Sequence, residues 1–76
     1  MDNRAGRLLR DRRLELGLTQ EDMALELGMS IHQYQRYEYG DRKLMNSPMR
    51  IGLRICEVLE LDPYEVVFEM KTKRNG

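Results

Sequence analysis

The segment from Thr19 to Gly40 constrains the fold most, because it contains start and stop signals for two short helices separated by about three residues. Thr19 is a typical helix N-cap, and Asp22 three residues later resembles the glutamate of a capping box. Gly28 can end the first helix in the left-handed conformation, and Ser30 caps a second helix that stops at Gly40. Helices this short do not persist alone, so tertiary packing must hold them.

Apolar residues recur at helical spacing along the rest of the chain, and no stretch alternates as a strand does. We predict a helix over about 4–16, ended by Gly17, and another that starts with Ser47 as N-cap and Pro48 as its first residue. A polar connector over 41–46 precedes that helix, and a last helix covers about 63–70. The pattern predicts an all-α domain of five short helices around one core.

The expected core consists of the apolar residues that share one side of each helix. They are Ala5, Leu8, Leu9, Leu16, Met23, Ala24, Leu27, Tyr34, Tyr37, Ile51, Ile55, Val58 and Leu59. Cys56 is expected to lie with them as a small buried hydrophobe, with a redox sensor as the alternative.

The length and composition indicate one domain over residues 1–76, with a core over about 4–70 and a polar tail over 71–76. No apolar run approaches the roughly 20 residues that span a bilayer, and no secretory signal opens the chain. A single cysteine cannot form an internal disulfide. We therefore expect a cytoplasmic protein without a membrane segment.

Thirteen basic residues balance thirteen acidic ones, so the chain lacks the net positive charge that many nucleic-acid-binding domains have. The distribution is uneven, however, and local patches are what a phosphate backbone contacts. Two stretches are rich in cations: Arg4, Arg7, Arg10, Arg12 and Arg13 in the first, and Arg36, Arg42, Lys43, Arg50 and Arg54 in the second. A solvated face of mixed charge remains the alternative interpretation.

The outer face of the second short helix, over about 31–39, suggests a function. Ile31, His32, Gln33 and Arg36 lie on the side that the two core tyrosines leave free. Histidine, glutamine and arginine hydrogen-bond base edges, and isoleucine can touch a thymine methyl. When two helices joined by a tight turn bind DNA, the second one enters the major groove. The sequence therefore predicts contact with double-stranded DNA, although an idle surface histidine remains possible for His32.

Several elements in order give a family resemblance: Leu18-Thr-Gln, Ala24, Leu27-Gly-Met-Ser and Glu38-Tyr-Gly. The chain resembles the lambda-repressor/Cro-like (XRE) helix-turn-helix family over about residues 7–67, and is similar to small Cro proteins and restriction-modification controller proteins. The resemblance implies a five-helix, usually dimeric domain that binds operator DNA and acts as a transcriptional repressor or regulator. Tyr34 and Tyr37 stand where the family usually has small aliphatic residues, and the loop before the fourth helix is longer than in the shortest members.

The same resemblance implies roles for individual residues. Gln20 would meet the DNA backbone at the start of the second helix. Ser30, Ile31, His32 and Gln33 would open the recognition helix, with Arg36 one turn later at a base or a phosphate. Arg42 and Lys43 fall in the loop that contacts phosphate.

Arg13 lies on the apolar stripe of the first helix, so a partly buried charge there needs an acidic partner. The family resemblance points to Glu38. We expect a structural ion pair between the first and third helices.

The last helix is apolar on more than one side, which suggests a homodimer. We expect Tyr64, Val67 and Phe68 to fill the core, which leaves Val66 and Met70 for a second subunit. A symmetric dimer would separate the two recognition helices by roughly 34 to 36 Å, one turn of DNA.

The sequence is compatible with one other class of function and disfavours another. A protein-interaction module, such as an antitoxin that masks a partner, agrees with the charge neutrality and the apolar last helix. An enzyme is not expected, because one histidine and one cysteine with no phosphate loop or acid/base cluster offer no machinery. We expect no metal and no cofactor, since structural zinc needs three or four Cys/His ligands.

Overall fold

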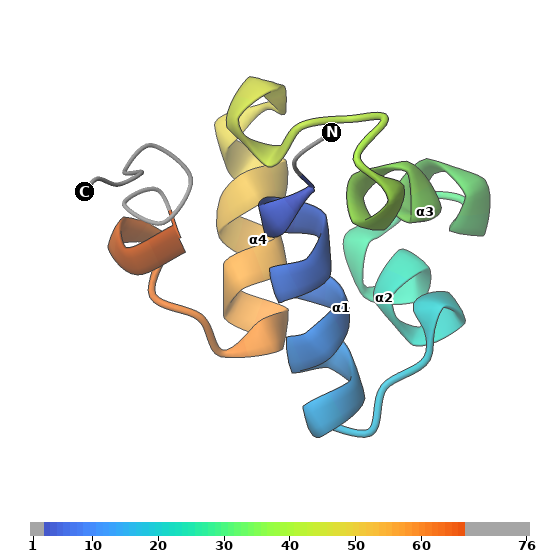
Figure 1. Ribbon diagram of the computed structural model, residues 1–76. Helices are drawn as coiled ribbons and strands as arrows, with labels where there is room; N and C mark the ends of the chain where they lie inside the picture. The colour runs from blue at the N-terminus through green and yellow to red at the C-terminus, as the bar shows by residue number, and fades with distance from the viewer. Residues whose placement is uncertain (1–2, 67–76) are drawn as a thin grey trace.

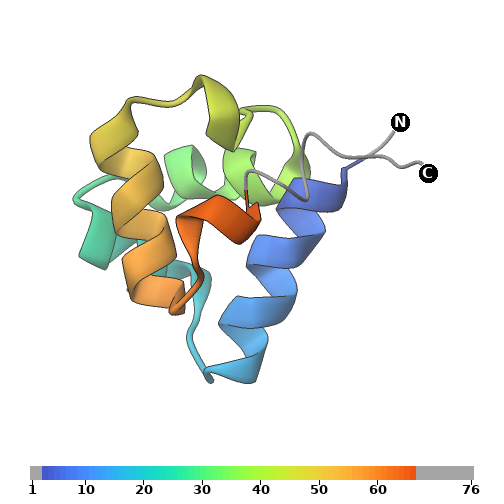
Figure 2. The same ribbon diagram turned by 90° about the vertical axis from the view of Figure 1, so that its left-hand side faces the viewer.

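The computed structural model describes residues 3–66, which form helices and contain no strand. In chain order the elements are α1 (Arg4–Glu15), α2 (Gln20–Leu27), α3 (Ile31–Tyr39), the 3-10 helix η1 (Leu44–Asn46) and α4 (Met49–Leu59), followed by a helical turn at 63–66. α1 and α4 run through the middle of the molecule, with α2 and α3 on one side and the turn at 63–66 on the other (Figures 1 and 2). The all-α class with five helices is confirmed.

The capping signals explain why two such short helices form. The Thr19 hydroxyl accepts the Asp22 backbone N–H at 2.9 Å, and the Asp22 carboxylate accepts the Thr19 N–H at 2.9 Å. This reciprocal bonding lowers the pKa of Asp22. Ser30 and Gln33 form the same box at the start of α3, and Gly28 makes the turn between the helices with φ of 67°. The predicted starts of both helices are confirmed, and each satisfies backbone donors that a helix leaves open.

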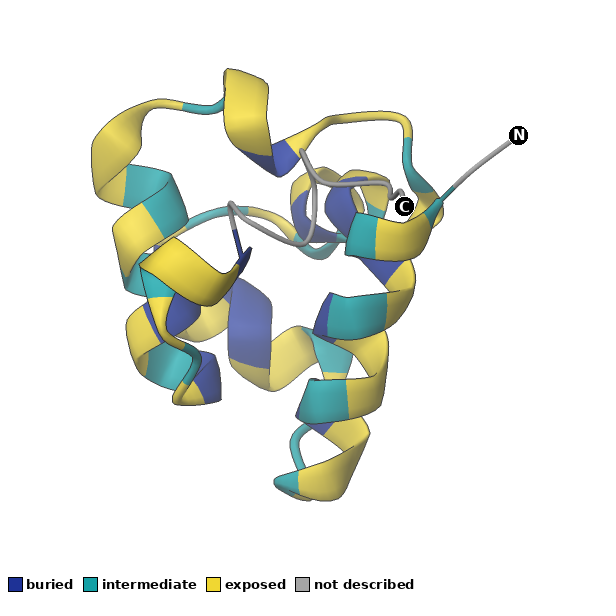
Figure 3. Ribbon diagram, turned by 60° about the vertical axis from the view of Figure 1, so that its left-hand side comes forward, coloured by how far each residue is buried: buried dark blue, intermediate teal, exposed yellow. Residues whose placement is uncertain are grey.

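The core lies where the helices face one another, while their outer sides are exposed (Figure 3). Its largest fully buried side chains are Tyr34, Leu9, Met23, Ile55 and Leu59. All five belong to the predicted core. Other predicted core residues are only partly buried and pack against it, namely Leu8, Leu16, Ile51 and Val58. Ala5 is also only partly buried.

A glycine on α1 allows a close approach between α1 and the end of α3. A Cβ atom at Gly6 would overlap the Glu38 carbonyl oxygen, so no other residue fits without a backbone shift. The same carbonyl accepts a hydrogen bond from Asn3 Nδ2 at 2.9 Å. The start of α1 is thereby held against the C-terminal half of α3.

The segment before α4 differs from the prediction in two ways. The stretch 41–46, expected as a polar connector, contains η1 and buries Leu44 in the core. Ser47 is not the N-cap of α4, because its hydroxyl donates to the Leu44 carbonyl at 2.6 Å and so finishes η1 instead. The N-cap is Pro48, which has no side-chain donor or acceptor to offer, and the helix begins at Met49.

The faces of the last helical turn were predicted the wrong way round. Val66, expected at a subunit interface, is 3% exposed and packs in the core, whereas Tyr64, expected in the core, is 87% exposed. Residues two apart on a helix point to nearly opposite sides, so burying Val66 turns Tyr64 outward. The turn lies against α1 and α4, where Val66 meets the core (Figure 2). Val67, Phe68 and Met70 lie outside the described residues.

The remaining observations concern the one cysteine and the membrane. Cys56 is buried in α4, and burial raises the pKa of its thiol, as expected for an inert core cysteine. None of the helices between residues 3 and 66 is both long enough and apolar enough to cross a membrane.

Candidate nucleic-acid interface

Helix α3 has one buried face and one exposed face. Tyr34, Tyr37 and Glu38 are buried, and His32 and Arg36 are exposed on the opposite side. Three further residues complete the exposed side: Tyr39 is exposed, Gln33 is exposed at one edge, and Ile31 is half-buried at the other. The structure thus brings Ile31, His32, Gln33 and Arg36 onto or beside one accessible surface.

Gln33 has a structural role that the sequence prediction missed, although Ser30 and Gln33 have the spacing of a capping box. Its Oε1 accepts the Ser30 backbone N–H at 2.9 Å, while the Ser30 hydroxyl accepts the Gln33 N–H at 3.1 Å. The capping box therefore fixes the direction of the Gln33 side chain at the N-terminus of α3. Its Nε2 group makes no hydrogen bond within residues 3–66 and is left as a donor on the exposed surface.

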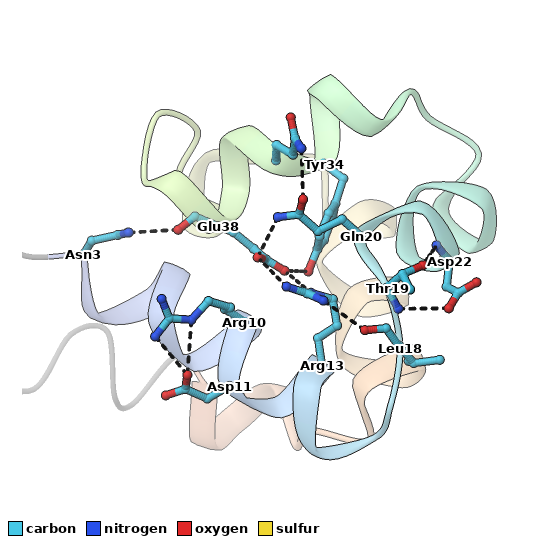
Figure 4. A network of polar contacts seen from close by, with 11 residues as sticks. Asn3, Arg10, Asp11, Arg13, Leu18, Thr19, Gln20, Asp22, Tyr34 and Glu38 are labelled. Carbon is cyan, nitrogen blue, oxygen red and sulfur yellow. Dashed lines mark hydrogen bonds and ion pairs between the residues drawn. The ribbon is translucent and has the colours of Figure 1, made fainter.

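A buried ion pair supports α3 from behind (Figure 4). The pair expected between Arg13 and Glu38 is present, with Nε to Oε2 at 2.6 Å and Nη2 to Oε1 at 3.2 Å. Arg13 Nη1 also donates to the Leu18 carbonyl at 2.9 Å, and the Tyr34 hydroxyl donates to Glu38 at 2.5 Å. These bonds join α1, the loop before α2 and α3 through one carboxylate.

Burial alone would raise the pKa of Glu38, but the hydrogen bonds from Arg13, Tyr34 and Gln20 outweigh it and hold the pKa below its ordinary value. The hydrogen bond to Glu38 likewise raises the pKa of Arg13. Burial, reinforced by the bond to the carboxylate, raises the pKa of Tyr34. The site therefore holds a charged pair and a neutral phenol.

Gln20, the residue expected at the DNA backbone, is linked to this network. Its Nε2 donates to Glu38 at 3.0 Å, and its Oε1 accepts from Gln35 Nε2 at 2.9 Å. The side chain is only partly buried, so it keeps an accessible edge at the N-terminus of α2. Gln35 was not predicted as a site residue; only its place one turn after Ile31 could have indicated it.

Cations around α3 lack carboxylate partners. Among the described residues, no ion pair neutralises Arg7, Arg36, Arg42, Lys43 or Arg50, and all five are exposed. Four of these belong to α3, to the loop after it or to the start of α4. In this group Arg42 lies over the Tyr37 ring at 6.0 Å, and its backbone N–H donates to the Arg36 carbonyl at 3.0 Å.

Three of these cations line a cavity of about 290 Å³ beside α3. Gln33, Arg36, Arg42 and Arg50 line it together with the turn at Gly28, and no acidic residue does. Pro48 and Ile51 form the wall contributed by the start of α4, and that helix has no side-chain cap. The three guanidinium groups, with no acidic side chain in the lining, favour an anion there.

Arg50 is the residue that sequence reasoning missed at this cavity. The sequence placed it in a basic stretch but gave no reason to separate it from Arg54. The distinction depends on Glu26 and Glu57, which both pair with Arg54. Only the three-dimensional packing of α2 against α4 shows that Arg50 is left without such a partner.

Within the described part of the chain, no three His, Cys, Asp or Glu side chains gather as metal ligands would. His32 lies on the exposed face of α3, apart from Cys56, which is buried in α4.

Comparison with known proteins gives one family. A family model described as a helix-turn-helix domain matches residues 4–67. That range agrees with the resemblance noted over about 7–67. No curated protein and no solved structure matches the chain significantly.

Proposed function

The chain belongs to the helix-turn-helix domain family, and on that premise we propose that it is a sequence-specific regulator of transcription that places α3 in the major groove of double-stranded DNA. The observation that supports this most is the arrangement of charge. Cations without carboxylate partners gather around an exposed recognition face, although the whole chain has no net charge. Such cations can replace the counterions that a DNA backbone releases.

The base contacts in this proposal come from the exposed side of α3. Arg36 pairs with guanine through two donors, and His32 bonds a base edge one turn earlier. Gln33 offers its Nε2 donor, since its oxygen is already held at the helix start. Ile31 contacts a thymine methyl from the edge of the face.

Phosphate contacts flank these side chains. Arg42, Lys43 and Arg50 bind the backbone as point charges without base preference. The uncapped start of α4 adds backbone N–H donors on the same side. Gln20 and Ser30 meet the backbone at the starts of α2 and α3.

The proposal includes a homodimer on a two-fold symmetric operator, in the cytoplasm, with repression by operator occupancy as in the Cro proteins that the chain resembles. Val66 has no part in the interface, because the protomer already buries it. Tyr64 presents a large uncovered ring on the same turn, and Met70 remains a candidate outside the described residues.

Selection of bound sites from a random duplex library tests this function. We expect one enriched motif with two half-sites about one helical turn apart. Arg36→Ala should relax the preference at one base pair of each half-site, whereas Arg54→Ala, which removes a paired cation, should select the same motif. Absence of any enriched motif with the wild-type chain would contradict the proposal.

A protein-interaction module is the second candidate, because Leu25, Met49 and Leu53 are exposed apolar side chains on α2 and α4. A module of this kind would bind duplex DNA weakly and without sequence preference. The same selection therefore distinguishes the two functions.

A further inference from the structure

Resting on this proposed function, we propose that Gln35 is a further specificity-determining residue of α3. Its side-chain carbonyl oxygen accepts a hydrogen bond from a base amino group in the major groove. A chain of hydrogen bonds that begins at buried Glu38 and passes through Gln20 sets the direction of that oxygen.

The first link fixes Gln20. Glu38 is 4% exposed, and its carboxylate receives Arg13, Tyr34 and Gln20 as donors. An ionised carboxylate only accepts hydrogen bonds, so the amide of Gln20 must turn its NH2 group toward Glu38 (Figure 4). The reverse orientation would place the Gln20 oxygen against a negative charge.

The second link fixes Gln35. With its nitrogen committed to Glu38, Gln20 presents its oxygen to Gln35, and an amide oxygen also only accepts. Gln35 must therefore turn its nitrogen inward, where Nε2 lies 2.9 Å from Gln20 Oε1. The Gln35 oxygen is left at the other end of the amide. The charge of one buried residue thus determines which end of a partly exposed side chain is free.

The position of Gln35 suits base contact. It lies four residues after Ile31 and three after His32, and this spacing places all three on one side of α3. The side chain is only partly buried. The base that the Gln35 amide contacts in the groove therefore lies next to the base pairs that Ile31 and His32 contact.

An acceptor at this place discriminates between bases. Adenine and cytosine show an amino donor in the major groove, whereas guanine O6 and thymine O4 are acceptors. A freely turning glutamine could offer its NH2 group instead and so tolerate guanine or thymine. With the direction set by Glu38 and Gln20, we expect Gln35 to require adenine or cytosine on the strand it faces.

Three variants test this on the full chain by selection from the same random duplex library. Gln35→Met keeps the length of the side chain and removes both its donor and its acceptor. Gln20→Met leaves Gln35 in place but removes the link that orients it. Arg54→Gln is the control, a change of a polar side chain on α4 that is outside the chain of bonds to Glu38 and away from the exposed face of α3.

For Gln35→Met we expect the adenine-or-cytosine preference at one base pair of each half-site to fall roughly three- to tenfold, the size of one net hydrogen bond, with the other positions unchanged. Gln20→Met should relax the same base pair and also weaken binding to every sequence. Arg54→Gln should leave the selected motif unchanged, and the melting temperature of Gln35→Met should stay close to that of the wild type.

Two results would overturn the inference while leaving the proposed function in place. One is that Gln35→Met selects a motif identical to the wild-type motif at every position. The other is that the base preference lost in Gln35→Met is for guanine or thymine rather than for adenine or cytosine. A wild-type chain that selects no motif would instead contradict the proposed function itself.

Discussion

Arg50 and Arg54 lie one turn apart on α4 and line one groove together, yet only Arg54 forms ion pairs there. Arg54 pairs with Glu26 at 2.8 Å and with Glu57 at 2.8 Å, and its bond to Glu57 raises its pKa. Arg50 has no carboxylate partner among the described residues. On one side it lines a cavity without acidic side chains, and on the other it lines the groove that contains Glu26 and Glu57. A phosphate can therefore approach Arg50 directly, but at Arg54 it would compete with two carboxylates.

The same contrast extends over the molecule. On α1, Arg10 pairs with Asp11 and Arg12 pairs with Glu15 and Glu60, whereas Arg7 at the start of the helix has no carboxylate partner among the described residues. Around α3, four cations have no carboxylate partner among residues 3–66: Arg36, Arg42, Lys43 and Arg50. A net charge of zero thus combines a neutralised surface with a positive one. Function follows from where the carboxylates lie rather than from their number.

The largest loss of stability is expected when the buried Arg13, a third kind of cation, loses its carboxylate partner. Glu38→Ala leaves its charge without a partner, and breaking a buried pair commonly costs about 3 to 5 kcal/mol of unfolding free energy. Chemical denaturation should show this loss. Glu57→Ala, which breaks an exposed pair, should change stability little because water screens it. Equal losses for the two variants would contradict the distinction between buried and exposed pairs.

Acid should act on the same buried pair. The folded pKa of Glu38 is lower than its unfolded pKa, so its contribution to stability is complete above the ordinary glutamate pKa and is lost as pH falls through the folded pKa. Wild-type stability should therefore decline on the acid side of that ordinary value. Denaturation of Glu38→Gln across the same range should give a shallower decline. Parallel curves would show that another carboxylate dominates.

Substitution of different unpaired cations should have different effects on the base specificity of DNA binding. Arg36→Ala should cost about 1 to 3 kcal/mol of discrimination at one base pair, because a bidentate guanine contact is lost. Lys43→Ala should weaken all duplexes alike, as expected for a phosphate contact. Competition between the selected duplex and single-pair variants measures both. If Arg36→Ala weakens binding to all duplexes equally, Arg36 contacts the phosphate backbone and not a base.

The smallest effect on stability is expected at the end of α4, where Glu60 contacts Arg12. Glu60 is the one non-glycine residue with positive φ in the described chain, at 57°. Glu60→Gly should relieve that conformation and raise stability by up to about 1 kcal/mol, reduced by the loss of the 3.7 Å contact to Arg12. Thermal unfolding measures this, and DNA affinity should not change. A lower melting temperature would show that the contact outweighs the backbone.

The sequence predicted the parts of the fold that local signals determine. The capping residues Thr19 and Ser30 and the glycine turn at Gly28 located α2 and α3, because each satisfies its own neighbouring backbone. The side of the last turn could not be predicted in the same way. Val66 and Tyr64 are both apolar enough to be buried, and only packing against α1 and α4 selects between them.

The candidate site shows the same limit. The exposed face of α3 followed from its helical period, since Tyr34 and Tyr37 claim the opposite side. Arg50 and Gln35 did not follow, because their significance depends on partners that are distant in sequence. For Arg50 these are the carboxylates that pair with Arg54 instead, and for Gln35 it is Gln20.

Salt dependence of duplex binding tests the central claim, that the unpaired cations form the DNA-binding surface. The matched pair is Arg50→Gln and Arg54→Gln, which remove the same charge one turn apart on one helix. The affinity for the selected duplex should be measured over a series of salt concentrations for both variants and the wild type. We expect Arg50→Gln to reduce the slope of log affinity against log salt by about one unit, and Arg54→Gln to leave it unchanged. Equal slopes for the two variants, or a loss confined to Arg54→Gln, would contradict the account.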